Sequence, residues 1–125
     1  MRPQSAKAKG RRLQQEVRDA VLAAFPQLKP DDVRSTSMGA GGADLLLSPA
    51  AQWVFPFYVE CKNQESLNIW AALEQAEMGA FKDSLVFDRP ISHSIPLVVF
   101  RRNATKPYVA FAFNDFMELL KYAHA

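Results

Sequence analysis

The sequence predicts an α/β domain with a central mixed sheet of five strands flanked by helices. Two patterns lead to this prediction. Apolar residues recur every three to four positions in three separate segments, which is the period of a helix with one buried face. Short runs rich in β-branched and aromatic residues lie between them, bounded by glycine and proline, as in strands. With 125 residues, 49% of them hydrophobic, the chain has the size of one domain, predicted to span residues 1–125 in the order α-β-β-β-α-β-β-α.

The chain begins with a basic segment followed by the first predicted helix, over residues 11–25. In this helix Leu13, Val17 and Val21 recur at steps of four and mark one buried face. Residues 1–10 are polar to basic and lack such a pattern. We therefore expect them to form a basic, flexible N-terminal arm.

Three strands are predicted before the second helix. Residues 31–37 are compatible with a short strand, and the glycine-rich loop 38–42 separates it from a largely buried strand at 43–47. The third strand, 53–61, is rich in aromatic residues and valine. Pro56 lies inside this run, which indicates an edge position or a bulge.

The second half of the chain predicts a helix, a pair of strands and a last helix. Ser66 is a plausible N-cap for a helix that ends near residue 82. Residues 97–100 and 108–113 have the pattern of paired strands. The D-x-x-E sequence at 115–118 is a capping box, and it predicts a short C-terminal helix that ends near residue 122.

Composition excludes several classes of protein. A single cysteine, Cys61, cannot form an internal disulfide or a cysteine-based zinc site, so a cytoplasmic setting is expected. No apolar run approaches the ~18 residues of a membrane span, so no membrane partner is expected. The glycine loop is not followed by the G-K-S/T motif of a P-loop, so nucleoside triphosphates are not expected as ligands.

The most informative residues are Asp44 and the segment 59–62, with the sequence VECK. Alternate residues of a strand share a face, so Glu60 and Lys62 project together. Asp44 begins its own strand directly after the glycine loop, and its carboxylate can approach Glu60 if the two strands pair. Two carboxylates and a strand carbonyl make an oxygen-rich site of the kind that Mg²⁺ prefers. The same residues could also be simpler: Glu60 and Lys62 as a solvated pair on an exposed strand face.

This grouping suits metal-assisted hydrolysis of a phosphodiester. A metal ion polarises the phosphate and generates the nucleophile, and the ammonium of Lys62 could orient or help deprotonate the water and offset charge on phosphorus. The net charge of +2 is also uneven, because residues 1–18 hold six basic side chains and one acidic one. Such a cluster keeps a terminus soluble or attracts phosphates, and next to this site we favour contact with DNA.

The G-x-D turn before one strand and the E-x-K at the end of the next resemble the PD-(D/E)xK nuclease superfamily, and within it the Holliday junction resolvases of archaea and phages. The resemblance covers roughly residues 9–82. It implies a restriction-endonuclease-like core, Asp44 and Glu60 as metal ligands, the main-chain carbonyl of Cys61 as a third ligand, and Lys62 as the catalytic lysine. The chain departs from the usual pattern at Ala43, where the superfamily normally has proline.

The resemblance also implies a role for the first helix. The resolvases begin with a basic K-G segment and a helix that bears a glutamate, which Lys9-Gly10 and Glu16 match. Glu16 is thereby a further candidate catalytic residue, with Gln14 as a rival for the same position. Read without the resemblance, Glu16 is an ordinary surface glutamate beside two arginines.

Other polar residues match the resolvases less directly. An R-S pair precedes the metal-binding aspartate in that family, and Arg34-Ser35 fits it. Gln75 lies on the helix after E-x-K, where related nucleases often have a polar site residue, and it is a further candidate for the catalytic site. The residues expected to contact DNA are Lys9, Arg11, Arg12, Arg34, Ser35 and Ser37.

The resemblance implies a Mg²⁺-dependent Holliday junction resolvase, with Mn²⁺ able to substitute, acting in a prokaryotic or phage-infected cell. Two symmetric nicks in a four-way DNA junction call for two sites, so a homodimer is expected. Two alternatives stay open. One is another nuclease of the same superfamily, of the repair, nicking or restriction type. The other is a DNA-binding module without catalysis, in which the acidic pair is structural.

Overall fold

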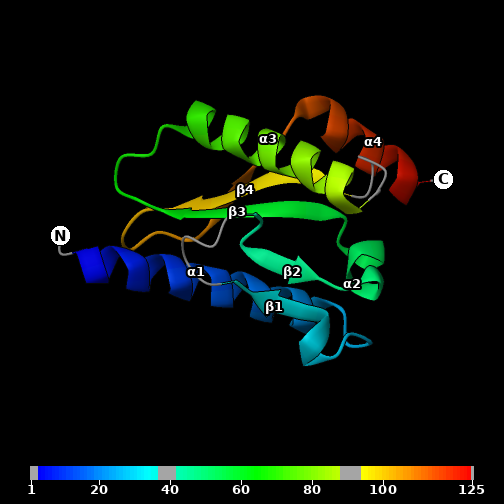
Figure 1. The fold of residues 1–125 in the computed structure, drawn as a ribbon, viewed down its shortest axis with the longest axis horizontal. Coiled ribbons are helices and arrows are strands. Elements are labelled where there is room, and N and C mark those ends of the chain that lie inside the picture. The colour runs from blue at the N-terminus through cyan, green and yellow to red at the C-terminus, as the bar shows by residue number, and fades with distance from the viewer. Residues whose placement is uncertain (1–2, 37–41, 88–93, 125) are drawn as a thin grey trace.

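The computed structural model describes residues 3–36, 42–87 and 94–124. Three layers are visible in Figure 1, with helix α1 on one side of strands β3 and β4 and helix α3 on the other. A 3₁₀ turn, η1, precedes the first strand. The elements are, in chain order, α1 (Pro3–Ala24), η1 (Pro30–Asp32), β1 (Val33–Ser35), β2 (Leu45–Leu47), α2 (Pro49–Val54), β3 (Phe57–Asn63), α3 (Ile69–Phe87), β4 (Ile95–Arg101), β5 (Tyr108–Ala110) and α4 (Phe113–Ala123).

The strands of the described residues form two sheets, so the prediction of one five-stranded sheet is wrong, although the mixed α/β class is confirmed. β1 and β2 pair antiparallel, with Val33 opposite Leu47. In the second sheet β4 lies between the other two strands. It runs parallel to β3, with Glu60 opposite Val98, and antiparallel to β5.

The two sheets meet at Asp44 without joining. The backbone N–H of Asp44 donates to the carbonyl of Val59 at 2.9 Å, as in a ladder. Two residues later on β3, the N–H of Cys61 donates to the Oδ2 atom of Asp44 at 2.6 Å. The Asp44 side chain thus accepts the hydrogen bond from β3, while its main-chain carbonyl accepts one from the N–H of Thr36 at 3.0 Å.

A short helix replaces the start of the predicted strand 53–61. Ser48 caps α2, because its side chain accepts a hydrogen bond from the N–H of Ala51 at 3.1 Å. Pro49 follows at the first helical position, where its missing N–H costs nothing. β3 begins after Pro56 and extends to Asn63. Pro56 therefore precedes the strand and makes no bulge, but β3 is an edge strand of its sheet, so the other predicted reason for the proline is confirmed.

Helix α1 is longer than predicted. It begins at Pro3, so residues 3–10 of the expected arm are helical. The segment contains alanine, lysine and glutamine, which favour helix even where no apolar stripe is present. Gly10 is buried, and the side-chain amide of Asn63 donates to the carbonyl of Lys9. The start of α1 thus lies against the end of β3.

The other helices also differ from prediction at their ends. Asn68, not Ser66, caps α3, since its side chain accepts from the N–H of Ala71 at 3.1 Å and its carbonyl from Ala72. Helix α4 begins at Phe113, so the expected capping box at 115–118 does not form its start. None of the helices in residues 3–36, 42–87 and 94–124 is long and apolar enough to cross a membrane.

The core has one part on each face of β3 and β4. Facing α1 is the larger part, in which residues of α1 pack against both strands: Leu13, Val21, Val59, Cys61, Leu97 and Val99. Facing α3 is a smaller part, where Ala72 and Ala76 pack on Val98. Because side chains alternate along β3, the residues between its core positions project toward α3, which is where the candidate site lies.

Candidate active site

Asp44 and Glu60 are brought together at the edge of β3. Asp44 is held on β3 twice, by its N–H to Val59 and by its carboxylate to the N–H of Cys61. These partners are the immediate neighbours of Glu60 in the strand. The carboxylate of Asp44 therefore lies close enough to Glu60 for its charge to act on that of Glu60. Asp44 thus approaches Glu60, as predicted for the case that the two strands pair. Only one backbone hydrogen bond, from Asp44 to Val59, joins the two segments here.

Glu60 is buried, with 5% of its surface exposed. It lies opposite Val98, which packs on α3, so it projects into the layer between β3 and α3. The side chain of Lys62, two residues later, projects from the same face of the strand and is partly exposed. The interpretation of Glu60 as half of a solvated surface pair does not fit this burial.

Both carboxyl groups are protonated more readily than usual. The pKa of Glu60 is raised to about 7, because burial and the negative charge of Asp44 raise it more than the nearby ammonium of Lys62 lowers it. Burial also raises the pKa of Asp44, while the hydrogen bond from Cys61 and the charge of Lys62 lower it. A buried and a partly buried carboxylate that lie close together are stabilised by a nearby positive charge.

The donors present suit a hard divalent cation. Asp44 and Glu60 offer carboxylate oxygens, the ligands such ions prefer. Within the described ranges, no group of three or more His, Cys, Asp or Glu side chains could hold a metal ion. The two carboxylates would therefore need main-chain carbonyl or water oxygens to complete a coordination shell. The thiol of Cys61 does not compete, because it is buried in the core on the α1 side and burial raises its pKa above the usual range.

A cavity of about 420 Å³ opens between β3 and α3 beside Glu60. Gln75 lies in its wall, so the structure brings this predicted site residue together with Glu60. Residues of three segments line the cavity: Gly42, Tyr58, Glu60, Gln75, Met78, Gly79, Lys82, Asp83 and Val86. Gly42 has a φ of 76°, in the left-handed region that glycine adopts without strain, and it leads directly toward Asp44.

Tyr58 is a cavity residue that the sequence patterns did not indicate. Its side chain is 4% exposed, and burial together with the charges of Glu60, Asp83 and Asp44 raises its pKa to about 12, so the hydroxyl stays protonated. A Cβ atom at Gly79 would lie 2.3 Å from the Tyr58 hydroxyl oxygen. Only glycine lets α3 approach β3 this closely.

Lys82 and Asp83 are further cavity residues that the sequence patterns did not indicate. The sequence contains a pattern that could have indicated Lys82. Gln75, Gly79 and Lys82 follow one another at steps of four and three, which puts them on one face of a helix. The sequence does not say that this face borders Glu60. That depends on how α3 packs on β3.

Glu16 and Gln14, the two candidates on the first helix, have different surroundings. The carboxylate of Glu16 forms an ion pair with Arg101 at the end of β4 and is half exposed. It does not belong to the described lining of the cavity beside Glu60. Gln14 is buried, at 1% exposed, on the side of α1 that packs on the sheet. A catalytic role for Glu16 stays a prediction.

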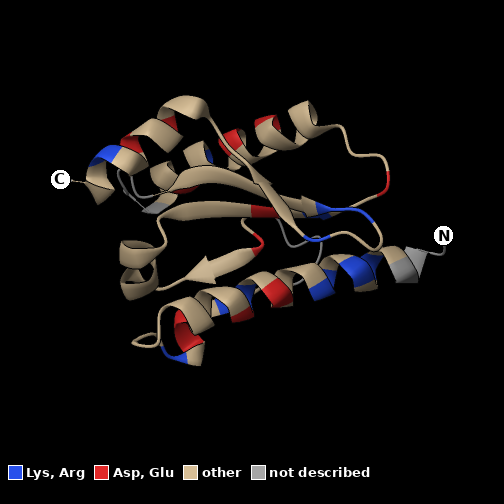
Figure 2. Ribbon diagram, turned by 180° about the vertical axis from the view of Figure 1, so that it is seen from behind, with Lys and Arg blue, Asp and Glu red and all other residues tan. Residues whose placement is uncertain are grey.

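The residues expected to contact DNA lie on two elements. Lys9, Arg11 and Arg12 are on the N-terminal half of α1, and in the ribbon of Figure 2 the basic positions of this half lie near basic positions at the ends of the strands. Arg34 is exposed on β1. Ser35 is partly buried and pairs with Leu45, next to Asp44. Ser37 lies outside the described residues.

Residues 5–124 match the model of a protein family described as phage putative PDDEXK endonuclease. No curated protein and no solved structure matched the chain. The match covers nearly the whole chain and confirms the PD-(D/E)xK superfamily, though not the narrower resemblance to Holliday junction resolvases. Nucleases of this superfamily act on DNA and generally use divalent metal ions. Together with the paired carboxylates at the edge of β3, the match shows that this chain belongs to the phage PDDEXK endonuclease family.

Proposed function

We propose that the protein is a metal-dependent DNA endonuclease that resolves four-way junctions, with Asp44, Glu60 and Lys62 as its catalytic residues. The observation that carries this proposal is the double attachment of Asp44 to β3, on either side of the buried Glu60. If Asp44 and Glu60 had only a structural role, burying one carboxylate beside the other would not stabilise the fold. Without a cation the two neighbouring carboxylates lower the stability of the fold, whereas with a cation bound they serve as its ligands.

Asp44 and Glu60 would hold Mg²⁺, or Mn²⁺ in its place, together with the main-chain carbonyl of Cys61. The ion would polarise the phosphate and lower the pKa of a water molecule. Asp44 keeps its position through the N–H of Cys61, which leaves its second oxygen available to a ligand. Glu60 is excluded from bulk water, which strengthens its interaction with any cation.

Lys62 supplies positive charge from the chain itself. It follows Glu60 on the same strand face and acts electrostatically on both carboxyl groups. An ammonium at this position would stabilise the negative charge that develops on the phosphate oxygens as the bond to the leaving group breaks. It would also orient the attacking water by hydrogen bonding.

DNA would be held by the basic residues of α1 and by Arg34 and Ser35. Lys9, Arg11 and Arg12 lie toward the N-terminal half of α1, and the start of that helix reaches the end of β3 through Asn63. Lysine and arginine in this position give attraction to phosphates without reading sequence. This suits an enzyme that selects a DNA shape.

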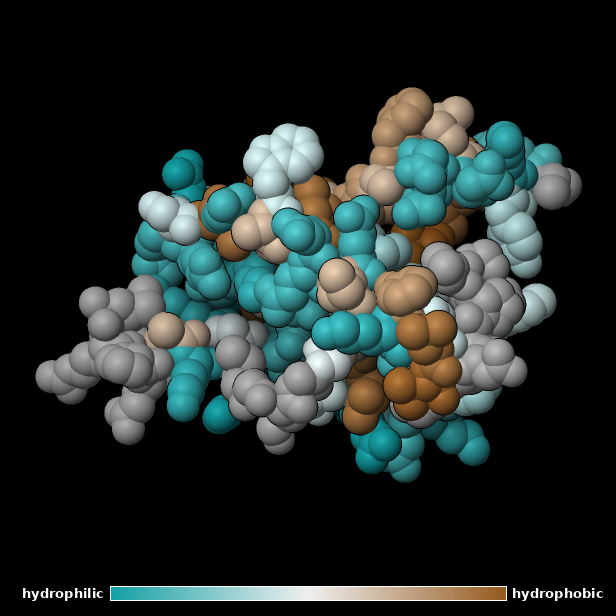
Figure 3. Space-filling view, turned by 45° about the horizontal axis from the view of Figure 1, so that its top comes forward, coloured by the Kyte–Doolittle hydropathy of each residue, from teal (hydrophilic) through white to brown (hydrophobic). Residues whose placement is uncertain are grey.

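Paired nicks would require two copies of the chain. Large apolar side chains are exposed along the second half of α3 and on α4. In α4 no described residue is buried. Figure 3 shows apolar side chains gathering toward the end of this face that carries the C-terminus. An exposed apolar surface of this kind supports the proposal of a homodimer. The residues are Phe81, Leu85, Phe113, Phe116, Met117 and Leu120.

The test is a competition among labelled DNA substrates with Mg²⁺ present. A four-way junction, linear duplex, a flap and single-stranded DNA are mixed, and the products are separated on a denaturing gel. We expect the junction to be cut first, with paired nicks symmetric about its centre. Equal cutting of linear duplex would contradict junction resolution and favour a repair, nicking or restriction nuclease. Binding to all substrates without any cutting would favour a non-catalytic DNA-binding module.

A further inference from the structure

One face of α3 forms a wall of the cavity beside Glu60. Gln75, Met78, Gly79 and Lys82 succeed one another at steps of three, one and three residues, so they project to the same side of the helix. The neighbouring face, with Ala72 and Ala76, packs on β4 instead. The wall is therefore a helix face next to the candidate catalytic residues, and it is not part of the core.

Gly79 sets the distance between this wall and β3. Glycine inside a helix costs about 1 kcal/mol relative to alanine, so its presence in the middle of α3 needs a compensating reason. Here that reason is contact, because any side chain at Gly79 would overlap the ring and hydroxyl of Tyr58. With α3 held this close, the next turn of the helix carries Lys82 over the same cavity as Glu60.

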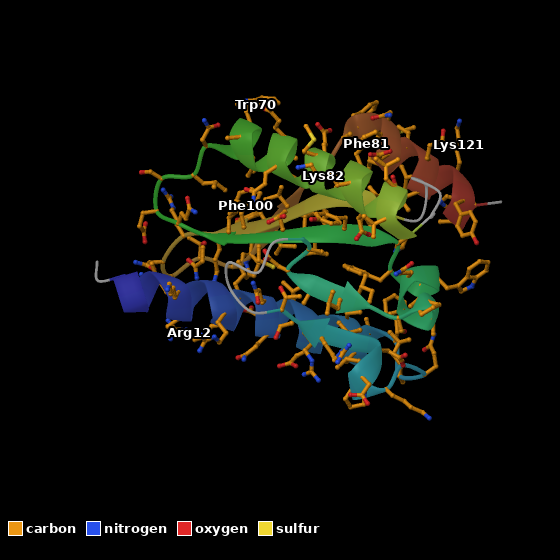
Figure 4. The ribbon with its side chains drawn as sticks, viewed as in Figure 1. Arg12, Trp70, Phe81, Lys82, Phe100 and Lys121 are labelled. Atoms are coloured by element: carbon orange, nitrogen blue, oxygen red, sulfur yellow. The ribbon has the colours of Figure 1, made fainter. Side chains whose placement is uncertain are left out.

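Charge makes Lys82 the decisive residue of the cavity. Among the residues that line it in the described part of the chain, Glu60 and Asp83 are acidic and Lys82 alone is basic. A phosphodiester group entering here meets two carboxylates that repel it. Figure 4 shows Lys82 on α3, far from Lys121, which lies on α4 at the C-terminal end of the molecule.

The size of the cavity and the nature of its rim suit part of a nucleic-acid strand. A volume of about 420 Å³ is within the range of about 300–1,000 Å³ typical of small-molecule sites, larger than a simple anion needs. Met78 and Val86 are both more than half exposed at the cavity and offer apolar contact beside the charge of Lys82. A nucleotide has this combination of an anionic group and an apolar sugar edge.

We propose that Lys82 binds a phosphate of the DNA strand that is cut, within the cavity that contains Glu60. This inference rests on the proposed function and adds a substrate-binding residue on α3 to the site on β3. Lys82 would hold a phosphate next to the scissile one, so it would act in binding and not in the chemical step.

The test measures DNA binding and cleavage by Lys82→Ala, Lys82→Arg and the control Lys121→Ala. Dissociation constants are measured with Ca²⁺ over a series of salt concentrations, and kcat and KM are measured with Mg²⁺. Loss of one phosphate contact should lower the slope of log K against log salt by about 0.9. We expect Lys82→Ala to show this lower slope, with KM raised about five- to tenfold and kcat within about twofold of the parent.

The two comparison variants make the result specific. Lys82→Arg keeps the charge and should restore most of the affinity. Lys121→Ala removes an exposed lysine on α4, which is paired with Glu118, and should leave slope and KM unchanged. A Lys82→Ala protein with the parental salt slope and KM would overturn the role of Lys82, and so would a loss confined to kcat. If the parent protein neither cuts nor binds DNA, the proposed function fails and the role of Lys82 fails with it.

Discussion

Asp44 shows how one side chain can shape both a sheet and a site. Its carboxylate accepts the N–H of Cys61 at 2.6 Å, and its own N–H donates to Val59, so it links the segment before β2 to β3. The same contact puts a carboxylate beside Glu60. The residue that links the two sheets is thus one of the two that would bind the metal.

Two replacements of Asp44 separate its structural and chemical roles. Asp44→Asn keeps an oxygen that can accept the N–H of Cys61 and should fold stably, but without the charge it should lose metal-dependent cleavage. Asp44→Ala leaves a part-buried N–H without its partner, which should lower the free energy of unfolding by about 1–3 kcal/mol relative to Asp44→Asn. Urea unfolding measures the difference, and equal stability of the two variants would contradict the account.

Glu60 should destabilise the protein when no metal is bound. Its pKa is raised to about 7 in the folded state, against 4.5 for a free glutamate, so the protonated form is favoured on folding. The stability that this form contributes is complete below pH about 4.5 and is lost as the pH rises through about 7. With EDTA at pH 8, Glu60→Gln should therefore be more stable than the parent by about 1–3 kcal/mol. Thermal unfolding at pH 4 and pH 8 is the check, and a variant less stable than the parent at pH 8 would refute this reading.

At the scale of elements, the sequence was a better guide to strand faces than to helix ends. The alternation of Val59, Glu60, Cys61 and Lys62 between two faces is a property of any strand and could be predicted. The start of α1 could not, because residues 3–10 are helical without an apolar stripe. Helix α2 was also missed, since a helix of six residues is too short to show a period.

The close packing of α3 on β3 depends on Gly79. Gly79→Ala should lower the free energy of unfolding by about 1–3 kcal/mol, because the new methyl group would overlap the ring of Tyr58. In a Tyr58→Ala background the same change should be neutral or stabilising by up to about 1 kcal/mol, since alanine is the better helix former. A double-mutant cycle by urea unfolding gives both values. The same cost in both backgrounds would show that Tyr58 does not impose the glycine.

The link between η1 and α2 should make stability depend on pH. Asp32 accepts hydrogen bonds from the hydroxyl of Ser48 and from the N–H of Lys29, both at 2.7 Å, and these lower its pKa below 3.8. A lowered pKa gives stability that is present above pH about 4 and is lost as the pH falls further. Asp32→Asn should weaken this acid dependence.

The measurement is thermal unfolding between pH 2 and pH 6, with Asp31→Asn as the control. Asp31 is exposed in the same turn, and its replacement removes the same charge. We expect the control to keep the acid dependence of the parent. If Asp32→Asn keeps it as well, the hydrogen bonds of Asp32 do not account for the acid sensitivity.

For the whole molecule, the net charge of +2 conceals two surfaces. Basic residues gather on the first half of α1 and near the ends of β3 and β4, whereas the site at the edge of β3 is acidic. The acidic centre and E-x-K pair could be predicted from spacing, because Glu60 and Lys62 lie on one strand and Asp44 directly before another. Tyr58 and Lys82 could not, because their place in the site depends on the packing of one layer on another.

The central claim is that Asp44, Glu60 and Lys62 form a nuclease site, and Lys62→Ala tests it most directly. The rate of Mg²⁺-dependent cleavage is measured on the DNA that the parent cuts fastest, and binding is measured with Ca²⁺ in place of Mg²⁺. Lys121→Ala is the control for removal of a positive charge. The account predicts that Lys62→Ala cuts at least about 100-fold more slowly than the parent and the control, with an affinity for DNA within about threefold. A Lys62→Ala protein that cuts as fast as the parent would contradict it.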